Sequence, residues 1–146
     1  MNSYKRLFII SAILVAVSGC TINKMSNKEI LQTKVITLSQ HEIRVELPVT
    51  QREQGLGLGG RTNLSDDEGM LFEFIGERVP AFWMKGMLIP IDIIWINQGY
   101  IIGINSNVPP DDGKRLYSPP SSASSVLEVA AGWTSRHRTV IGDHIE

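Results

Sequence analysis

The sequence has few of the residues on which cross-linking and metal binding depend. Its 146 residues include one cysteine, Cys20, so no disulfide bridge can form within the chain. The three histidines, His41, His137 and His144, lack the spacing of zinc ligands, and Asp111-Asp112-Gly113 lacks the remaining acids of a calcium loop. We therefore expect no metal ion and no other cofactor.

An excess of positive charge is also missing. The chain has 14 basic and 15 acidic residues, for a formal net charge of −1. Two of the basic residues and none of the acidic residues precede Cys20, so the part from Cys20 onward has 12 basic and 15 acidic residues and a formal charge of −3. Proteins that bind nucleic acid need a basic face, so we expect no nucleic-acid partner.

A hydrophobic run long enough to span a membrane is absent from the N-terminus. The apolar stretch of residues 7–17 is shorter than the ~20 residues that a membrane-spanning helix needs. Two basic residues precede it, and it leads into Val17-Ser18-Gly19-Cys20, which resembles the lipobox of bacterial lipoproteins. The pattern predicts a signal peptide over residues 1–19 and a diacylglyceryl group on Cys20. The alternative is an ordinary signal peptide that happens to end beside a cysteine.

The predicted lipid indicates where in the cell the rest of the chain is located. Two acyl chains on Cys20 give a stable attachment to a membrane, where one chain is marginal. The next residue is Thr21 and not aspartate, which by resemblance to enterobacterial sorting favours the outer membrane, facing the periplasm. Residues 20–32 are predicted to be the lipidated N-terminus and a tether. Residues 33–146 have the size of one domain with one core.

Most of residues 33–146 has the periodicity of β-strands. Residues 34–38 and 42–47 alternate polar with apolar side chains around a turn at Ser39-Gln40-His41. Further strands are predicted at residues 70–74, 81–84, 91–96, 100–104 and 126–129, with a turn at 97–99 and a long loop at 106–125. Along residues 91–96, alternation places Ile91, Ile93 and Trp95 on one face and Asp92, Ile94 and Ile96 on the other.

Two segments favour short helices. Thr50 and Glu53 have the spacing of a capping box at the start of residues 50–54, and residues 133–138 fit one or two helical turns. Many short strands without a sustained helical period predict a mainly β domain, a β-sandwich or barrel with one or two short helices.

Residues 55–60, Gly-Leu-Gly-Leu-Gly-Gly, match the glycine spacing of a dinucleotide-binding loop. That pattern has meaning only between a strand and a helix of a parallel α/β unit. Here a polar helical stretch precedes it and a turn follows it. We therefore interpret the segment as a tight or flexible loop.

Acidic residues within apolar strands are candidates for function. Asp92 and Glu128 each lie in such a strand, where an ionised carboxylate is costly unless it is paired or hydrated. With Glu68 they make a set of three acids, for which three interpretations remain open: an ion pair with Lys85 or Arg61, a polar binding site, or a catalytic pair of carboxylates. We expect Lys85, Asp92 and Glu128 to approach one another on one side of the domain.

The segment Phe82–Pro90 combines large aromatic residues with a cation and a turn. It fits either the lining of a ligand groove or an ordinary core strand and hairpin.

Several segments in succession resemble one family. These are Asp67–Phe72, Phe82–Lys85, Ile89–Ile93, Asn107–Pro110, Tyr117–Pro119, Val126–Gly132 and Gly142-Asp143. Together they resemble the bacterial and archaeal family known as domain of unknown function 192. Gly86-Met87 stands where the family often has Asn-Thr, and the loop before Arg61 is about two residues longer than usual, as judged against the family pattern.

The resemblance implies a compact, mainly β domain that is often exported or lipid-anchored, and it brings no activity. Its motifs contain six residues that we take as candidate ligand-binding residues: Glu68, Trp83, Lys85, Asp92, Tyr117 and Glu128. The leading hypothesis is a non-catalytic envelope lipoprotein that binds a small molecule, a glycan or a protein. The alternatives are a small hydrolase that cleaves a glycan with paired carboxylates and a purely structural envelope component.

Overall fold

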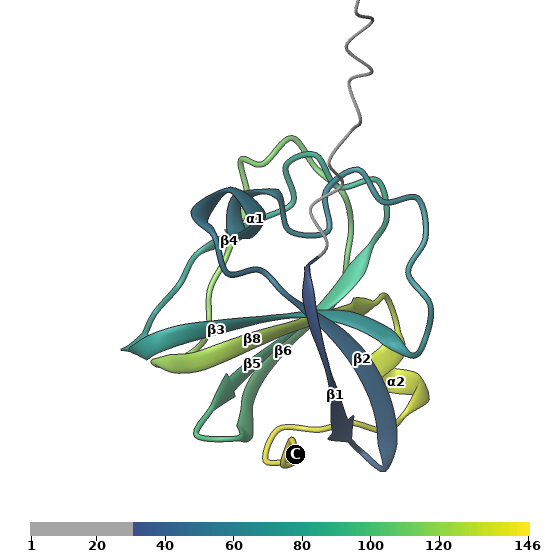
Figure 1. The fold of residues 1–146 in the computed structure, drawn as a ribbon, viewed down its shortest axis with the longest axis vertical. Coiled ribbons are helices and arrows are strands. Elements are labelled where there is room, and N and C mark those ends of the chain that lie inside the picture. Colours follow the sequence, from purple (N-terminus) through teal and green to yellow (C-terminus); the bar gives the residue numbers. More distant parts are fainter. Residues whose placement is uncertain (1–30) are drawn as a thin grey trace, which may run out of the picture.

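The computed structural model describes residues 31–146 (Figure 1). The signal peptide, Cys20 and nearly all of the tether predicted above lie outside the described residues. The strands are β1 (Gln32–Leu38), β2 (His41–Leu47), β3 (Glu68–Arg78), β4 (Phe82–Trp83), β5 (Ile91–Asn97), β6 (Tyr100–Val108), β7 (Leu116–Tyr117) and β8 (Ala123–Ala130). The helices are α1 (Gln51–Leu56) and α2 (Trp133–Arg136).

Six of the strands form one strongly twisted sheet in the order β1-β2-β3-β8-β5-β6, and β4 pairs with β7 in a separate two-stranded sheet (Figure 1). All neighbours in the large sheet are antiparallel except β2 and β3, which run parallel. The prediction of a mainly β domain with one or two short helices is confirmed. Among residues 31–146, no helix has the length and apolarity required to cross a membrane.

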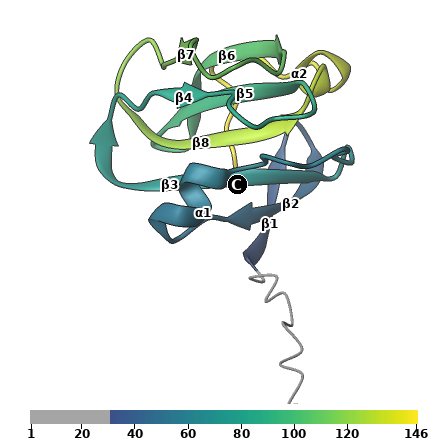
Figure 2. The ribbon, with the colours of Figure 1, turned by 90° about the horizontal axis from the view of Figure 1, so that it is seen from above.

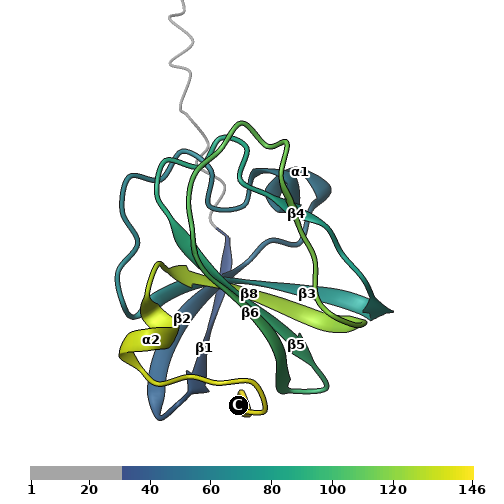
Figure 3. The ribbon, with the colours of Figure 1, turned by 180° about the vertical axis from the view of Figure 1, so that it is seen from behind.

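The C-terminal segment joins the two outer strands of the large sheet. Ile145 bridges to Leu38 at the end of β1, and His144 bridges to Tyr100 at the start of β6. Figure 3 shows this segment running from α2 past the end of β1 toward the turn between β5 and β6. The sheet is thereby closed at this end, which gives the domain its barrel-like character.

The core lies on both faces of the sheet, as the alternation along β5 predicts. Ile94 and Ile96 pack into one cluster with Trp133 of α2. Ile93 and Trp95 pack into a second cluster on the other face. The second cluster also contains Leu58, Met70, Phe72, Met84, Met87, Ile91, Val108, Tyr117 and Val126.

Local sequence accounts for the turns and for the first helix. Ser39 and Gln40 both have positive φ and form a two-residue turn between β1 and β2. Thr50 caps α1 by accepting the backbone N–H of Glu53, whose side chain accepts the N–H of Thr50, so the predicted capping box is present. The predicted loop at 106–125 begins later than expected, because β6 continues to Val108 and pairs with Ile91.

The domain has two distinct ends along its long axis (Figure 1). The loop end carries α1, β4, β7 and the connections around them, and Figure 2 looks onto this end. The hairpin end carries the turns of β1–β2 and β5–β6 and the C-terminus (Figure 1). The described chain starts at the loop end, since Leu31 lies in the same hollow as Leu56 of α1.

Candidate functional site

A pocket of about 350 Å³ opens at the loop end, between α1, the glycine loop after it, and strands β3, β4 and β8. Its lining consists of Gln54, Gly55, Leu56, Gly57, Leu58, Phe72, Phe74, Arg78, Pro80, Ala81, Phe82, Trp83, Lys85, Met87 and Glu128. Most of these side chains are apolar or aromatic, as is usual for pockets that bind small molecules.

Aromatic rings form the walls of the pocket. The rings of Phe72 and Phe82 pack edge to face with their centroids 4.9 Å apart, and Phe82 packs in the same way on Trp95 at 5.6 Å. Edge-to-face packing of this kind adds to the stability that burial alone provides. Because Trp95 belongs to the buried core, the walls are held by the sheet beneath them.

Glu128 on β8 supplies the only carboxyl group among the residues that line this pocket. It lies directly opposite Met70 of β3 and Ile93 of β5, in the centre of the sheet, and only 6% of the residue is exposed. Its Oε2 atom is buried and has no hydrogen-bond partner among the described residues. Burial raises the pKa of Glu128 from 4.5 to about 8, and the attraction of the Arg61 guanidinium offsets only part of this rise. The carboxyl is therefore mostly neutral at pH 7.

The glycine loop covers this carboxyl. Gly57 ends α1 with φ +52° and ψ −135°, a conformation that side chains rarely permit. A Cβ atom there would lie 3.6 Å from Cζ of Phe72 and 3.9 Å from Oε2 of Glu128, so the backbone of Gly57 lies over both. The N–H of Gly60 donates to the carbonyl of Gly86 over 2.9 Å, which fastens the loop to the segment after β4. The loop thus forms a wall of the pocket.

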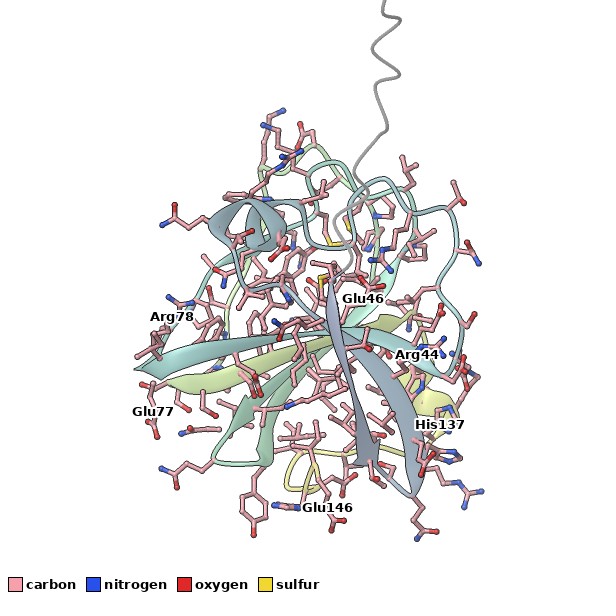
Figure 4. The ribbon with its side chains drawn as sticks, in the orientation of Figure 1. Arg44, Glu46, Glu77, Arg78, His137 and Glu146 are labelled. Carbon is pink, nitrogen blue, oxygen red and sulfur yellow. The ribbon has the colours of Figure 1, made fainter. Side chains whose placement is uncertain are left out.

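Two cations lie on the pocket lining. The Arg78 guanidinium lies 3.9 Å from the ring centroid of Phe74, and Figure 4 shows Arg78 at the outer end of β3. Lys85 follows β4, is exposed, and forms a backbone bridge with Asp111. Neither cation forms an ion pair with a residue in the described part of the chain. With Glu128 neutral, the pocket carries net positive charge.

Asp92 is placed elsewhere, contrary to the expectation that it approaches Lys85 and Glu128. Its Oδ1 accepts the backbone N–H groups of Asn107 and Gly132 over 2.8 and 2.9 Å. Its Oδ2 accepts the N–H and the hydroxyl of Thr134 over 2.9 and 2.7 Å. All four hydrogen bonds tie β5 to the end of β6 and the start of α2. Asp92 is therefore saturated by the protein itself and forms no ion pair with a lysine of the described part of the chain.

The other candidates separate in the same way. Trp83 and Lys85 line the pocket with Glu128, but Tyr117 lies in the core, paired with Phe82 across β4 and β7. Glu68 lines a second hollow of about 790 Å³ on the other side of the glycine loop. There the backbone N–H of Ser65, followed by the Arg44 guanidinium, lowers the pKa of Glu68.

Arg61 is not the partner of a buried acid. Its guanidinium binds both carboxylate oxygens of Glu46, which Figure 4 shows beside the start of β1. The structure therefore brings together three of the six candidates and separates them from Glu68, Asp92 and Tyr117.

Phe72, Phe74, Arg78 and Gly57 also belong to the site, although they are not among the residues predicted from the sequence. Phe72 and Phe74 point to one face of β3, which alternation along residues 70–74 could have indicated. Gly57 could have been predicted from the sequence as the glycine that ends the capped helix. Nothing in the sequence places Arg78 beside a pocket, since β3 was expected to end at Phe74.

Comparison with known proteins agrees with the fold and supplies no activity. The family DUF192, described as "Uncharacterized ACR", matches residues 34–146. A protein of unknown function from Novosphingobium aromaticivorans DSM 12444 has a similar structure, with a TM-score of 0.76, 32% identity, and coverage of 82% of this chain and 89% of that one. A proposed transcription regulator from Sinorhizobium meliloti 1021 is also similar, with a TM-score of 0.74, 31% identity, and coverage of 80% and 94%. No curated protein matches the sequence.

Proposed function

Because the chain belongs to the family domain of unknown function 192, which carries no established activity, we propose a function from the pocket: the domain binds a small molecule with an apolar body and a hydrogen-bond acceptor. The single observation that carries this proposal is the Glu128 carboxyl in the pocket wall, whose buried Oε2 atom has no hydrogen-bond partner within residues 31–146. A buried polar group without a partner is costly, and a ligand that accepts a hydrogen bond from it would remove the cost.

The protonation state of Glu128 defines what it recognises. With its pKa raised to about 8, the group is an O–H donor at neutral pH. A carboxyl kept neutral by an apolar site can donate a strong hydrogen bond to a carbonyl or to a carboxylate oxygen. The matching ligand atom is therefore an acceptor.

The aromatic and cationic residues of the lining determine which body and which charge of the ligand fit the pocket. Phe72, Phe82 and Trp83 offer apolar and aromatic surface to its body. Arg78 and Lys85 favour a negative charge and oppose a positive one. We infer a ligand that is neutral or anionic, such as a carboxylic acid or a carbonyl compound with an apolar body.

The paired-carboxylate hydrolase fits this pocket less well. Such an enzyme needs two carboxyl groups about 5 to 9.5 Å apart, both open to one cleft. Glu128 is the only acid that lines the pocket, and the candidate partner Asp92 is engaged by four donors on the opposite face. A purely structural component, in turn, has no need of a concave site. The presence of a pocket and of a single acid in its lining together favour ligand binding over hydrolysis and over a purely structural role.

Nucleic-acid binding has little support, although one similar protein is a proposed transcription regulator. Nucleic acid requires a basic face, and this chain has more acidic than basic residues. We keep the expectation of a small-molecule ligand.

The proposal is tested by measuring thermal shifts of the full chain with a set of carboxylic acids and carbonyl compounds that carry apolar bodies. A ligand at 100 times its dissociation constant adds about 2.7 kcal/mol of stability, which such a screen detects. For a hit, Glu128→Leu should abolish binding, and Glu128→Gln, which still donates a hydrogen bond, should retain part of it.

The matched control is Glu42→Gln, which changes an exposed glutamate of β2 that has no side-chain hydrogen bond among the described residues. It should leave affinity unchanged. A hit that binds Glu128→Leu as tightly as it binds the unaltered chain would overturn the proposal.

We also propose that the domain is held at a membrane of the cell envelope by lipid on Cys20. The support is the lipobox-like sequence Val17-Ser18-Gly19-Cys20 after a short apolar run. Metabolic labelling with a palmitate analogue should label the unaltered chain and not Cys20→Ser, because a hydroxyl cannot replace the thiolate that accepts the diacylglyceryl group. Absence of label from the unaltered chain would remove the lipoprotein interpretation.

A further inference from the structure

The loop end exposes a pair of large apolar side chains. Trp83 of β4 and Leu116 of β7 are register partners, and 51% and 58% of these residues are exposed. Leu88, in the next connection, is exposed as well. Trp83 also lines the pocket, so this apolar surface adjoins the pocket. Exposed tryptophan and leucine side chains of this kind are favoured at the interface between a membrane and water.

Cations flank this apolar pair. Lys85 lies two residues after Trp83, and Arg115 immediately precedes Leu116. Both are exposed, and neither forms an ion pair with a described residue. The Arg115 guanidinium instead lies 5.0 Å from the centroid of the Tyr117 ring. These positive charges remain available to an anionic surface.

The hairpin end differs in charge although it too exposes apolar residues. Tyr100 and Ile141 are 54% and 65% exposed. Asp143 and Glu146 belong to the C-terminal segment that packs beside Tyr100, and Figure 4 shows Glu146 at this end. An anionic membrane surface would repel these carboxylates. At the loop end Lys85, Lys114 and Arg115 exceed Asp111 and Asp112 by one charge, whereas at the hairpin end Asp143 and Glu146 exceed Arg138 by one charge. The two ends therefore differ in the sign of their local net charge.

The described chain begins at the loop end. Leu31 lies in the hollow that also contains Leu56, and Leu56 in turn lines the pocket. Cys20 precedes Leu31 by 11 residues. That length spans at most about 40 Å even when fully extended. A lipid on Cys20 would keep the loop end within this distance of the bilayer.

From these four observations we propose that the loop end docks on the surface of an anionic lipid bilayer through Trp83, Leu116, Lys85 and Arg115. The proposal rests on the lipid at Cys20 and is independent of the identity of the pocket ligand. Its consequence is that the pocket faces the membrane, because Trp83 and Lys85 belong both to the docking surface and to the pocket lining. Ligands that partition into the bilayer would then have the shortest path into the pocket.

The test uses tryptophan fluorescence of the full lipidated chain in vesicles of phosphatidylglycerol and brominated phosphatidylcholine. Bromine quenches an indole that reaches the acyl region. Trp95 and Trp133 are buried, so Trp83 is the exposed tryptophan of the three in the chain. Trp83→Phe gives the background from the buried pair. The matched control adds Tyr100→Trp to Trp83→Phe, which moves an indole to a site of similar exposure at the hairpin end of the same tethered molecule.

We expect a loss of Trp83 emission in the anionic vesicles, a smaller loss when phosphatidylglycerol is omitted, and none beyond background in the Tyr100→Trp control. Equal quenching at both ends would show that the domain has no preferred face and would overturn the proposal. Dimerisation that shields Trp83, seen by sedimentation together with absent quenching, would overturn it as well.

A chain that does not sediment with the vesicles would remove the lipid attachment and this docking together. Ligand binding in the pocket would stand or fall separately, by the thermal-shift screen.

Discussion

Asp92 of β5 and Glu128 of β8 lie on neighbouring strands and point to opposite faces of the sheet. Glu128 is the register partner of Ile93, whereas Asp92 is the partner of Val129. Both carboxyl groups are buried. Asp92 accepts four hydrogen bonds, whereas the Oε2 atom of Glu128 has no hydrogen-bond partner in the part of the chain that the structure describes. Asp92 therefore holds β5 to β6 and α2, and Glu128 is the acid on which the proposed ligand site depends.

The first prediction follows for Asp92. Asp92→Asn should destabilise the domain by about 3 kcal/mol, because hydrogen bonds to a charged group contribute about 1.5 to 3 kcal/mol each and the new amide N–H₂ faces donors. Chemical denaturation measures this loss. The pocket lies on the other face, so the affinity for a pocket ligand should not change under folding conditions. A loss of stability below about 0.5 kcal/mol, the size typical of a surface substitution, would contradict the structural role of Asp92.

The second prediction concerns the pH dependence of stability that Glu128 imposes. The pKa of Glu128 is raised to about 8 in the folded protein from 4.5. Between these values the folded state binds more protons than the unfolded state, so stability falls as pH rises from 4.5 toward 8. The stability that the protonated Glu128 carboxyl contributes is therefore fully present only below pH 4.5, and it is lost as the pH rises through about 8.

Glu128→Gln removes this titration. Relative to the unaltered chain, the variant should gain stability between pH 5 and pH 8.5 by on the order of 3 kcal/mol. Urea denaturation of both proteins at the two pH values measures the difference. Comparing the two proteins cancels the titration of all other groups. A difference that stays constant with pH would show that Glu128 is ionised in the folded state at neutral pH.

Strands and turns could be predicted from the sequence because they depend on residues that are close together in the chain. Alternation along residues 91–96 separates Asp92 from Ile93. The turn predicted at residues 39–41 is present at Ser39 and Gln40, while His41 already begins β2. The capping box of Thr50 and Glu53 is equally local. These predictions are confirmed because each rests on a period or a spacing within one segment.

The site could be predicted only in part from the sequence, because its composition depends on the order of the strands in the sheet. Glu128 meets Gly57 only because β8 lies between β3 and β5, a pairing between segments that are far apart in the sequence. Alternation within β5 and within β8 says nothing about whether Asp92 and Glu128 share a face. The register between the two strands decides that, and no short-range pattern encodes it.

The third prediction compares two glycines of one segment. Gly57→Ala should destabilise the domain by about 1 to 2 kcal/mol, because residue 57 has a positive φ that alanine adopts only with strain. Gly55→Ala should instead stabilise it by about 0.5 to 1 kcal/mol, since Gly55 lies within α1 and alanine is the better helix former.

Steric clashes of the added Cβ atoms do not affect this comparison. A Cβ atom at residue 57 would make ordinary contacts of 3.6 and 3.9 Å, and one at residue 55 would meet nothing within 4 Å. Thermal or chemical denaturation of the two variants tests the pair. Effects of the same sign would show that the conformation of the glycine loop differs from the one described.

The last prediction separates a tryptophan of the site from one of the core. Trp83 is 51% exposed at the edge of the pocket, whereas Trp133 is fully buried and its indole N–H donates to the carbonyl of Asp66 over 2.8 Å. Trp133→Ala should cost about 3 to 5 kcal/mol, as deletions of buried aromatic side chains do. Trp83→Ala should cost less than about 1 kcal/mol and should weaken binding of a pocket ligand. Denaturation and ligand titration, each done on both variants, distinguish the two roles. A loss of stability for Trp83→Ala as large as that for Trp133→Ala would show that Trp83 supports the core and would remove it from the site.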